Sequence, residues 1–343
     1  MPEKLLKHNN KDDKESEKDE KISMTLNELK TEELPQLKGI INFCANIPIF
    51  LYPHTTIVRS PETWYRGIYF STNRLVGEDF LLNHRRSDID ISMGLGVKAY
   101  KSFPVRGALA NRPLQDEEVK HVSVKLTEPE KLNVPIGPII RSRRSVRDFS
   151  GKTVKITELS TLLYYCQGVS AIADITQDIE GGFLGTRTLG PEYKNNLRNA
   201  PSGGALYPID LYLIVNDVEK LDKGIYQYMP NSHSLRIVRK FQEKEISTLT
   251  ESLAVFNGID SKKVNVYIIF VYNIILNSRK YGDSAMVFAL IETGEISQNI
   301  HLTATALGIG SCDIGGYKKQ QFEKFICVDG LSKQMVSLLL IGK

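Results

Sequence analysis

The sequence has few cysteines and no long hydrophobic run. Its four cysteines, Cys44, Cys166, Cys312 and Cys327, lie far apart and lack the C-x-x-C or Cys/His spacing of a metal site. This spacing favours small buried thiols in a reducing compartment over a disulfide framework, so we expect a cytoplasmic protein without a bound metal. No stretch reaches the roughly 20 apolar residues that cross a bilayer, and the first residues lack a signal-peptide core, so we expect no membrane association.

An excess of charge of one sign is also lacking. The 343 residues contain 44 Lys and Arg against 40 Asp and Glu, which leaves a net charge of +4. The basic residues form no long stripe of the kind that follows a phosphate backbone, so we expect no nucleic-acid partner. A hydrophobic fraction of 41% over this length is enough for a sizeable core.

The pattern of residues divides the chain into three parts. Residues 1–22 are mostly Lys, Glu, Asp and Asn, which predicts a disordered charged tail. Residues 23–135 mix apolar patches with Pro and polar residues, and their role is either docking of a substrate or partner, or covering the site. Clear periodicity begins in residues 136–343, which we expect to form the main domain.

One apparent motif in the middle part does not hold. "GLGVKA" at 94–99 fits the dinucleotide pattern G-x-G-x-x-A. That pattern needs a strand before it and a full helix after it, but Pro104 ends any helix within two turns. We therefore expect no dinucleotide site.

The third part predicts an α+β fold with an antiparallel-rich sheet flanked by helices. Thr157 is expected to cap a helix over 158–169, and a glycine-rich loop follows over 170–206. Strands are expected at 210–216, 224–229, 234–239, 264–273 and 335–341, the first three as a meander and the fourth as a central strand covered on both faces. Helices are expected at 242–254, 284–307 and 318–326. Helices separate only some of the strands, which argues against a regularly alternating parallel sheet.

Three polar segments of this part are candidate binding elements. "RSRRSVRDF" (141–149) is either a solvated basic turn or a phosphate cradle, because guanidinium groups bind phosphate oxygens through paired donors. "RNAPSGGALYP" (198–208) and "CDIGGY" (312–317) each contain two adjacent glycines, which expose backbone N–H groups where a Cβ would obstruct them. Each glycine pair alone is also compatible with a simple turn.

The predicted helix 284–307 has two distinct faces. Ile296, Ile300, Ala304 and Leu307 form one apolar stripe, while Glu292, Glu295 and Asn299 fall on another face. Its first two turns are apolar all round, so we expect a largely buried helix, either in the domain core or at a homodimer interface.

Taken together, these segments resemble a known family. "RSRRSVRDF", "RNAPSGGALYP", "GIYQYMPNSHSL", "KYG…FALIETGEISQNIHLTATALGIG" and "DIGGY" follow the order and approximate spacing of the FMN-dependent nitroreductase superfamily, specifically its SagB-type branch. That branch comprises the azoline dehydrogenases that make thiazoles and oxazoles in ribosomally made modified peptides such as bacteriocins, toxins and thiopeptides. The resemblance covers about 138–343 and implies a nitroreductase-like fold with FMN at a homodimer interface.

The resemblance also implies which residues bind the cofactor. The FMN phosphate would be held by Arg143, Ser145 and Arg147, with Arg144 alongside. The implied isoalloxazine contacts are Pro201, Ser202, Gly203 and Gly204 on one side, Gly315 and Gly316 near the flavin N5 edge, and Asn299, which approaches the flavin or the partner chain.

Lys280 and Tyr281 match the Lys-Tyr pair of the SagB-type enzymes, which implies that they are catalytic. Oxidation of an azoline removes a proton from the α carbon of the ring and a hydride from its neighbour, so the protein must supply a base. A lysine acts as that base when its amine is neutral, which desolvation and nearby positive charge both promote. Tyr281 would hold the ring or the amine. Without the other motifs, the pair reads as an ordinary surface Lys beside a Tyr.

Three functions follow as alternatives. The first is an azoline dehydrogenase acting on a precursor peptide, as a homodimer and in a larger complex with a cyclodehydratase. The second is an NAD(P)H-dependent nitroreductase or quinone reductase. The third is a non-catalytic scaffold subunit of a peptide-modification complex, against which the retained Lys280 and Tyr281 argue.

Overall fold

The structure is a computed structural model that describes residues 122–174, 194–241, 245–253 and 258–343, together with Phe80 and Val97. The described residues all lie in the unit Val58–Lys343. The predicted tail, most of the 23–135 region and the "GLGVKA" segment apart from Val97 lie outside the described residues.

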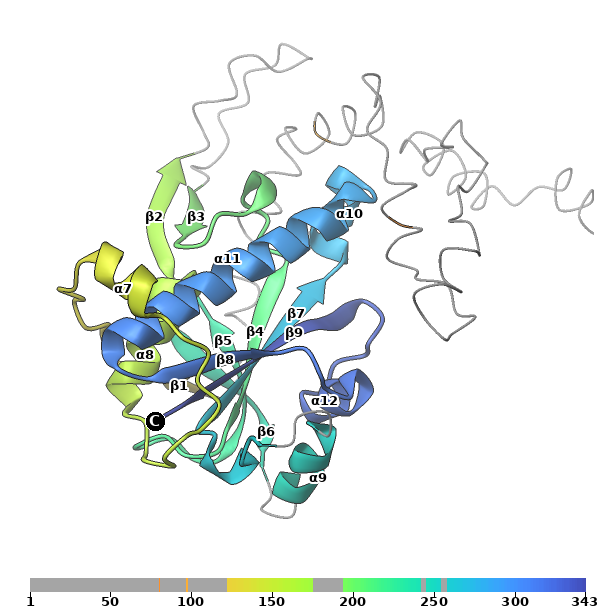
Figure 1. Cartoon of the computed structure of the whole chain (residues 1–343). Helices are drawn as coiled ribbons and strands as arrows, with labels where there is room; N and C mark the ends of the chain where they lie inside the picture. The colour runs from red at the N-terminus through yellow and green to blue at the C-terminus, as the bar shows by residue number, and fades with distance from the viewer. Residues whose placement is uncertain (1–79, 81–96, 98–121, 175–193, 242–244, 254–257) are drawn as a thin grey trace, which may run out of the picture. The chain divides into compact units, whose positions relative to one another are not determined.

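The described part of the chain is built on a seven-stranded sheet with the strand order β1-β6-β5-β4-β7-β9-β8 (Figure 1). Its pairs are all antiparallel, which confirms the α+β prediction. A separate two-stranded ribbon pairs β2 with β3. The strands are β1 (Ser123–Lys125), β2 (Val169–Asp174), β3 (Lys194–Arg198), β4 (Ile209–Val215), β5 (Gly224–Met229), β6 (Ser234–Lys240), β7 (Val266–Asn273), β8 (Gly310–Ile314) and β9 (Lys333–Gly342).

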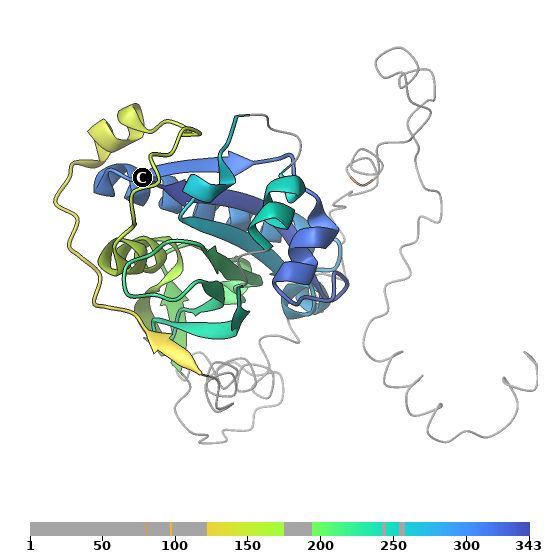
Figure 2. The same ribbon diagram turned by 90° about the horizontal axis from the view of Figure 1, so that it is seen from below.

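Helices cover both faces of this sheet, and Figure 2 shows the strands as a layer between them. Helices α8 and α11 pack on one face, and α9 and α12 pack on the other. The described helices are α7 (Ile136–Ser142), α8 (Ile156–Gln167), α9 (Glu245–Ser252), α10 (Ile275–Tyr281), α11 (Ser284–Leu307) and α12 (Lys319–Phe325), with the short 3₁₀ turns η2 (Gly203–Ala205) and η3 (Ser261–Lys263).

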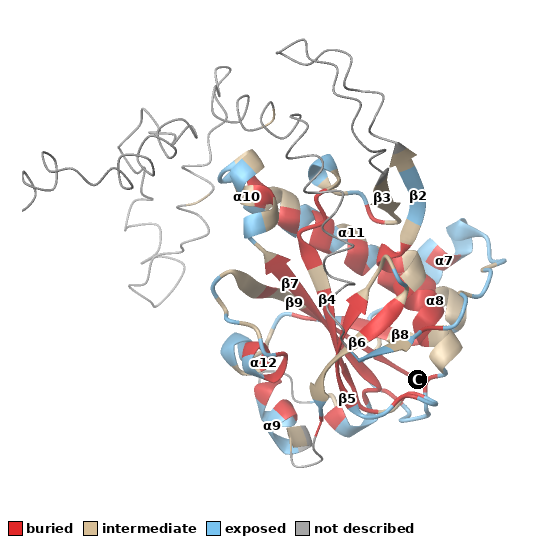
Figure 3. Ribbon diagram, turned by 180° about the vertical axis from the view of Figure 1, so that it is seen from behind, coloured by how far each residue is buried: buried red, intermediate tan, exposed pale blue. Residues whose placement is uncertain are grey.

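Strand β7 forms the centre of the core. Alternate side chains point to opposite faces of a strand, so Ile268 and Phe270 pack toward α8 and α11, while Tyr267 and Ile269 pack on the other face. All four are fully buried, and Figure 3 shows most of β7 in the colour of buried residues. The prediction of a central strand covered on both faces is therefore confirmed.

The start of α8 corrects the prediction for Thr157. The helix begins at Ile156, so Thr157 lies inside it, and Lys155 precedes it. The Lys155 backbone N–H donates to Glu158 Oε2 at 2.7 Å, and the other carboxylate oxygen of Glu158 pairs with Lys343 Nζ at 2.8 Å. A carboxylate at the third helical position thus satisfies the backbone at this end, and a threonine cap is not needed.

Other boundaries differ from the predictions in ways that matter for the site. The helix predicted over 158–169 ends at Gln167, because β2 begins at Val169. Most of β2, together with β3 and η2, lies in the predicted loop 170–206, and the residues before α11 form the separate helix α10. The antiparallel meander is confirmed as β4, β5 and β6. Periodicity could not reveal α10, because seven residues are too few to show it.

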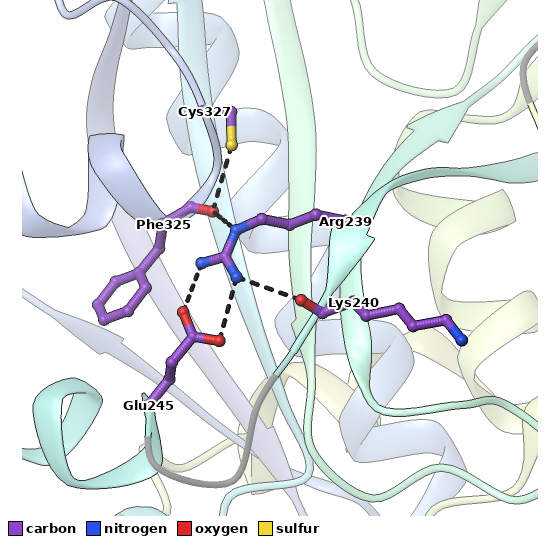
Figure 4. A network of polar contacts seen from close by, with 5 residues as sticks. All are labelled: Arg239, Lys240, Glu245, Phe325 and Cys327. Carbon is purple, nitrogen blue, oxygen red and sulfur yellow. Dashed lines mark hydrogen bonds and ion pairs between the residues drawn. The ribbon is translucent and has the colours of Figure 1, made fainter.

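A polar clamp fastens the face opposite α11. Arg239 of β6 makes two contacts with Glu245 of α9, from Nη2 to Oε1 at 2.7 Å and from Nη1 to Oε2 at 3.1 Å (Figure 4). Its Nε also donates to the Phe325 carbonyl at the end of α12, at 3.1 Å. A bidentate guanidinium pair of this kind fixes orientation as well as distance. It ties α9 and α12 to the sheet, and the candidate site lies on the other face.

Replacing Phe270 with Ala should lower the free energy of unfolding by about 3–5 kcal/mol, because it leaves a cavity in the most buried strand. Urea unfolding followed by circular dichroism measures this loss. The control is Ile275→Ala on α10, where the side chain is 51% exposed, and its effect should stay within about 0.5 kcal/mol. Equal losses in the two variants would contradict the assignment of β7 to the core.

Candidate functional site

The loop 198–208 is held in one conformation by its own polar groups. The Arg198 backbone N–H donates to the Tyr207 hydroxyl at 2.9 Å, and the Tyr207 N–H donates to Ser202 Oγ at 2.9 Å. The Arg198 guanidinium lies 4.5 Å from the centre of the Tyr207 ring. Ser202 and the two glycines after it are therefore presented on a fixed turn.

Gly204 is the position where this loop meets α10. Its φ is +64°, and a Cβ at this position would lie 2.2 Å from Lys280 Nζ and 2.6 Å from the Tyr281 hydroxyl. The positive φ favours glycine, and any side chain here would displace the ends of Lys280 and Tyr281 from the positions that they hold. The structure thus brings the predicted catalytic pair onto the predicted cofactor loop.

Lys280 and Tyr281 occupy the last turn of α10. Gly282 ends the helix with a φ of +53°, and the buried Asn277 holds the turn by accepting from the Tyr272 hydroxyl at 2.8 Å and donating to the Ala285 carbonyl at 2.9 Å. Asn277 was not among the predicted site residues. Its role depends on contacts made by α10, a helix too short to be predicted from the sequence.

An aromatic pair completes the setting of Tyr281. Its ring packs edge-on against Phe288 of α11, with the centroids 5.0 Å apart, and Lys280 Nζ lies 4.9 Å from the Tyr281 ring centre. Both members of the pair are half-buried. The amine is therefore partly removed from water and rests against an aromatic face, beside Gly203 and Gly204.

The arginine segment lies along β8, away from this loop in sequence. The Val146 N–H donates to the Ser311 carbonyl at 3.0 Å, and Ser145 forms a parallel bridge with the same residue. The positive charge of Arg143 is one of the influences that lower the pKa of Asp313. Burial raises the pKa of Cys312, and the positive charge of Arg147 opposes this rise. Arg144 differs, because its Nη1 donates to the carbonyls of Arg141 and Arg143 at 2.8 Å each and closes the end of α7.

A buried histidine joins α11 to the same strand. His301 contacts Ser311 Oγ through Nδ1 at 2.7 Å and Asp313 Oδ2 through Nε2 at 2.9 Å, and the Ser297 hydroxyl donates to Asp313 Oδ1 at 2.9 Å. Partial burial opposes ionisation of Asp313, but the hydrogen bonds from His301 and Ser297 outweigh it and hold its pKa below the usual value. Strand β8, beside which the arginine segment lies, is therefore fixed to α11 by polar contacts.

The remaining predicted cofactor residues lie near these two groups. Pro201 lines a pocket beside Ser202 and Gly203. Gly315 and Gly316 directly follow β8, and the space where a Cβ of Gly315 would stand is open. Asn299 is half-buried on α11 between Ser297 and His301 in sequence. The roles of these residues stay predictions.

Glu292 is the most unusual group of the site, and the sequence placed it only on a polar helix face. Its side chain is 2% exposed and lines the pocket formed by 201–203 and α11. Burial raises its pKa from 4.5 to about 7, and the Ser202 hydroxyl, the Arg198 charge and the Ile209 N–H only partly offset this effect. A carboxyl group near half ionisation at neutral pH therefore stands beside the glycine loop.

These features fit a bound flavin mononucleotide. Gly203 and Gly204 leave backbone exposed next to Lys280 and Tyr281. Arg143 and Arg147 form no ion pair with another residue in the described ranges, which leaves both guanidiniums for an anion such as a phosphate. No cluster of His, Cys, Asp and Glu suited to a metal ion occurs among the described residues. In the same part of the chain, no helix has the length and apolar character needed to cross a membrane.

Comparison with known proteins identifies the family. The sequence model of the Nitroreductase family matches residues 140–343, which is more than half of the chain. The chain belongs to the nitroreductase family. This match contains α7 from Ile140 onward, the sheet apart from β1, and each residue of the candidate site.

Two relatives give the range of similarity. "Putative nitroreductase MJ1384" of Methanocaldococcus jannaschii is 27% identical over 204 residues, which cover 60% of this chain and 90% of that protein. The microcin B17-processing protein McbC of Escherichia coli is 32% identical over 139 residues, which cover 38% of this chain and 49% of McbC.

Two solved structures are also similar. A nitroreductase-family structure from Ralstonia eutropha JMP134 has a TM-score of 0.47 at 20% identity and covers 64% of this chain and 89% of its own. A chain of the E. coli microcin synthetase McbBCD complex with truncated pro-MccB17 has a TM-score of 0.44 at 22% identity and covers 76% of this chain and 98% of its own. The family assignment rests on the sequence match.

The raised pKa of Glu292 predicts how stability depends on pH. Since the folded state holds a proton that the unfolded state has lost between pH 4.5 and about 7, wild type should lose stability relative to Glu292→Gln as the pH rises through this window, by at most about 3 kcal/mol. Urea unfolding at several pH values measures the difference. Glu251→Gln, at an exposed position of α9, should follow the wild-type curve.

Proposed function

We propose that this protein is an FMN-dependent dehydrogenase that oxidises thiazolines or oxazolines in a precursor peptide to thiazoles or oxazoles. The observation that carries the proposal is the placement of Lys280 Nζ and the Tyr281 hydroxyl against Gly204, on a loop suited to a planar cofactor. The sequence similarity to McbC, a microcin B17-processing protein, supports the same function.

The cofactor would be held at two places. Arg143, Arg147 and the exposed Ser145 would bind the phosphate, with Arg144 fixing the turn that carries them. Ser202, Gly203 and Gly204 would lie against the ring system, next to Pro201, and the backbone of Gly315 and Gly316 would approach its edge. When bound, FMN supplies the acceptor for the hydride that leaves the substrate ring.

Lys280 would take the proton in this reaction. The C–H bond at the α carbon of the azoline would break, its proton would pass to Lys280 Nζ, and its electron pair would form the new ring double bond as a hydride leaves the neighbouring carbon. Tyr281 would hold the substrate ring or the lysine amine by its hydroxyl. Partial burial and the packing of Tyr281 on Phe288 keep both groups in place.

A homodimer and a larger complex belong to this proposal. Three large apolar side chains of α11 are exposed in the single chain, namely Met286 (38%), Leu290 (49%) and Ile291 (53%). The first turns of this helix are therefore partly exposed in the single chain, and a second copy packed on them would cover this apolar surface. A cyclodehydratase that forms the azolines would hand its product to this dimer.

A simple nitroreductase or quinone reductase is the second candidate, favoured by the family itself and by the match over 90% of MJ1384. The two functions differ in the source of electrons. A nitroreductase is reduced by NADH or NADPH, whereas the azoline dehydrogenase is reduced by its peptide. Anaerobic bleaching of the flavin absorbance by an azoline peptide, and not by NADH, supports the first function, and the reverse result supports the second.

Lys280→Ala should fold and bind FMN yet lose azoline oxidation by on the order of 10²–10⁴-fold, the usual contribution of a positioned base. Lys280→Arg should fail almost as badly, because a guanidinium remains protonated. Tyr281→Phe should be milder, since it removes only the hydroxyl. The assay is mass spectrometry of a peptide that already carries azolines, with a loss of two hydrogens per oxidised ring.

Arg279→Ala, one residue before the pair and exposed, is the matched control for these variants and should keep wild-type turnover. Normal turnover by Lys280→Ala with equal flavin content would remove Lys280 from the mechanism.

Arg143→Ala combined with Arg147→Ala should yield colourless protein, because the two charges that would bind the phosphate are lost. Absorbance of the purified protein and chromatography of the flavin released on denaturation measure this, and the wild type should release FMN and not FAD. Full flavin content in the double variant would place the phosphate elsewhere. Arg236→Ala, which removes an arginine of β6 outside the segment 141–149, controls for a general effect of lost positive charge.

A further inference from the structure

Glu292 is a buried acid, and one of its carboxyl oxygens makes no hydrogen bond to the described residues. It is 2% exposed, and its Oε1 has no hydrogen-bond partner among the residues that the structure describes. Protein interiors rarely leave a carboxyl oxygen in this state, because the loss of its contacts with water is not compensated. The residue also lines the pocket between 201–203 and α11, so a molecule bound there would be within reach of this oxygen.

The surroundings determine how the carboxyl group carries its proton. The Ser202 hydroxyl and the Ile209 N–H approach it as donors. The Ser202 oxygen already accepts from the Tyr207 N–H, so the hydroxyl hydrogen is available for Glu292. Because these two donors do not reach Oε1, they approach the other oxygen, Oε2. In the neutral acid the proton therefore belongs on Oε1. Oε1 is then a hydrogen-bond donor, not an acceptor.

Other charged and titratable groups near Glu292 come from three elements. Arg198 of β3 favours its ionised form, while Glu295, one turn along α11, disfavours it. Lys280 and Tyr281 of α10 lie close to Gly204, and the Tyr281 ring lies close to Gly203 as well. Burial outweighs the attraction of Arg198. The balance leaves the neutral acid well populated at neutral pH.

We propose that Glu292 is a cofactor-binding group that, as a neutral acid, donates a hydrogen bond from Oε1 to a heteroatom acceptor on the edge of the flavin ring. This inference rests on the proposed function, because it takes FMN as the molecule beside Ser202 and Gly203. It assigns the pocket to the ring edge of the cofactor and gives the buried acid a partner. Binding therefore weakens when Glu292 loses its proton.

The experiment measures the dissociation constant of FMN for the wild type and for Glu292→Gln at several pH values, by quenching of flavin fluorescence. Glutamine keeps the size and a neutral donor but does not titrate. The ratio of the two constants cancels the titration of the FMN phosphate itself. We expect the two proteins to bind within about threefold of each other at pH about 6, and wild type to bind roughly tenfold more weakly at pH about 8.

Two further variants guard the interpretation. Glu295→Gln keeps Glu292 and should retain the pH dependence of FMN binding, with its midpoint at slightly lower pH, because the negative charge of Glu295 raises the pKa of Glu292.

 Glu292→Leu removes the donor and should bind FMN more weakly than wild type at pH about 6 and with no loss on raising the pH to about 8.

The outcomes separate the two proposals. A ratio of wild-type to Glu292→Gln constants that rises with pH supports this inference. FMN binding with a ratio that does not change with pH overturns the role of Glu292 and leaves the proposed function standing. If the wild type binds FMN at none of these pH values, both the proposed function and the role of Glu292 are overturned. Circular dichroism of each variant checks the fold, and if Glu292→Gln does not fold, the comparison of wild type with Glu292→Leu decides in its place.

Discussion

The candidate site depends on the close approach of α10 to Gly204. Lys280 Nζ and the Tyr281 hydroxyl occupy the space where a side chain at this position would stand. The contact requires the left-handed backbone at Gly204, the fixed turn made by Ser202 and Tyr207, and the clamp of Asn277 on the start of α11. A loop and a helix end more than 70 residues apart are thereby set in register without a covalent link.

Helix α11 connects this contact with the arginine segment. Glu292 faces the glycine loop, and Ser297, five residues along the helix, contacts Asp313 on β8. At 1.5 Å per residue, these two positions are about 7.5 Å apart along the axis. One rigid helix therefore sets the spacing between the loop proposed for the flavin ring and the strand beside the arginines proposed for its phosphate.

Much of the fold could be predicted because its strands carry strong local signals. The continuous apolar run of β7 and the meander of β4, β5 and β6 are visible in the residues themselves. The helix α10 and the ribbon of β2 and β3 could not be predicted in this way, because short elements with few apolar residues depend on tertiary contacts. The cap of α8 was misread because a threonine near a helix start is a common cap, whereas here Glu158 satisfies the backbone.

The site shows the same division. The glycine loop and the Lys-Tyr pair were found as motifs, but their contact through Gly204 is a property of the fold. Glu292 was visible only as one polar residue on a helix, since its burial depends on how α11 packs beside the loop. No single sequence pattern distinguishes a buried acid from an exposed one at the same helical spacing.

The position of β9 has a consequence for the order in which the molecule can be assembled. This strand lies between β7 and β8, although it follows both of them in the sequence. Until residue 342 has left the ribosome, β7 and β8 cannot be joined, and each exposes backbone groups that β9 will later pair. The arginine segment bonds to Ser311 on β8. Completion of the described sheet is thus a non-local step, because it joins residues 266–273 to 310–314 through the later segment 333–342.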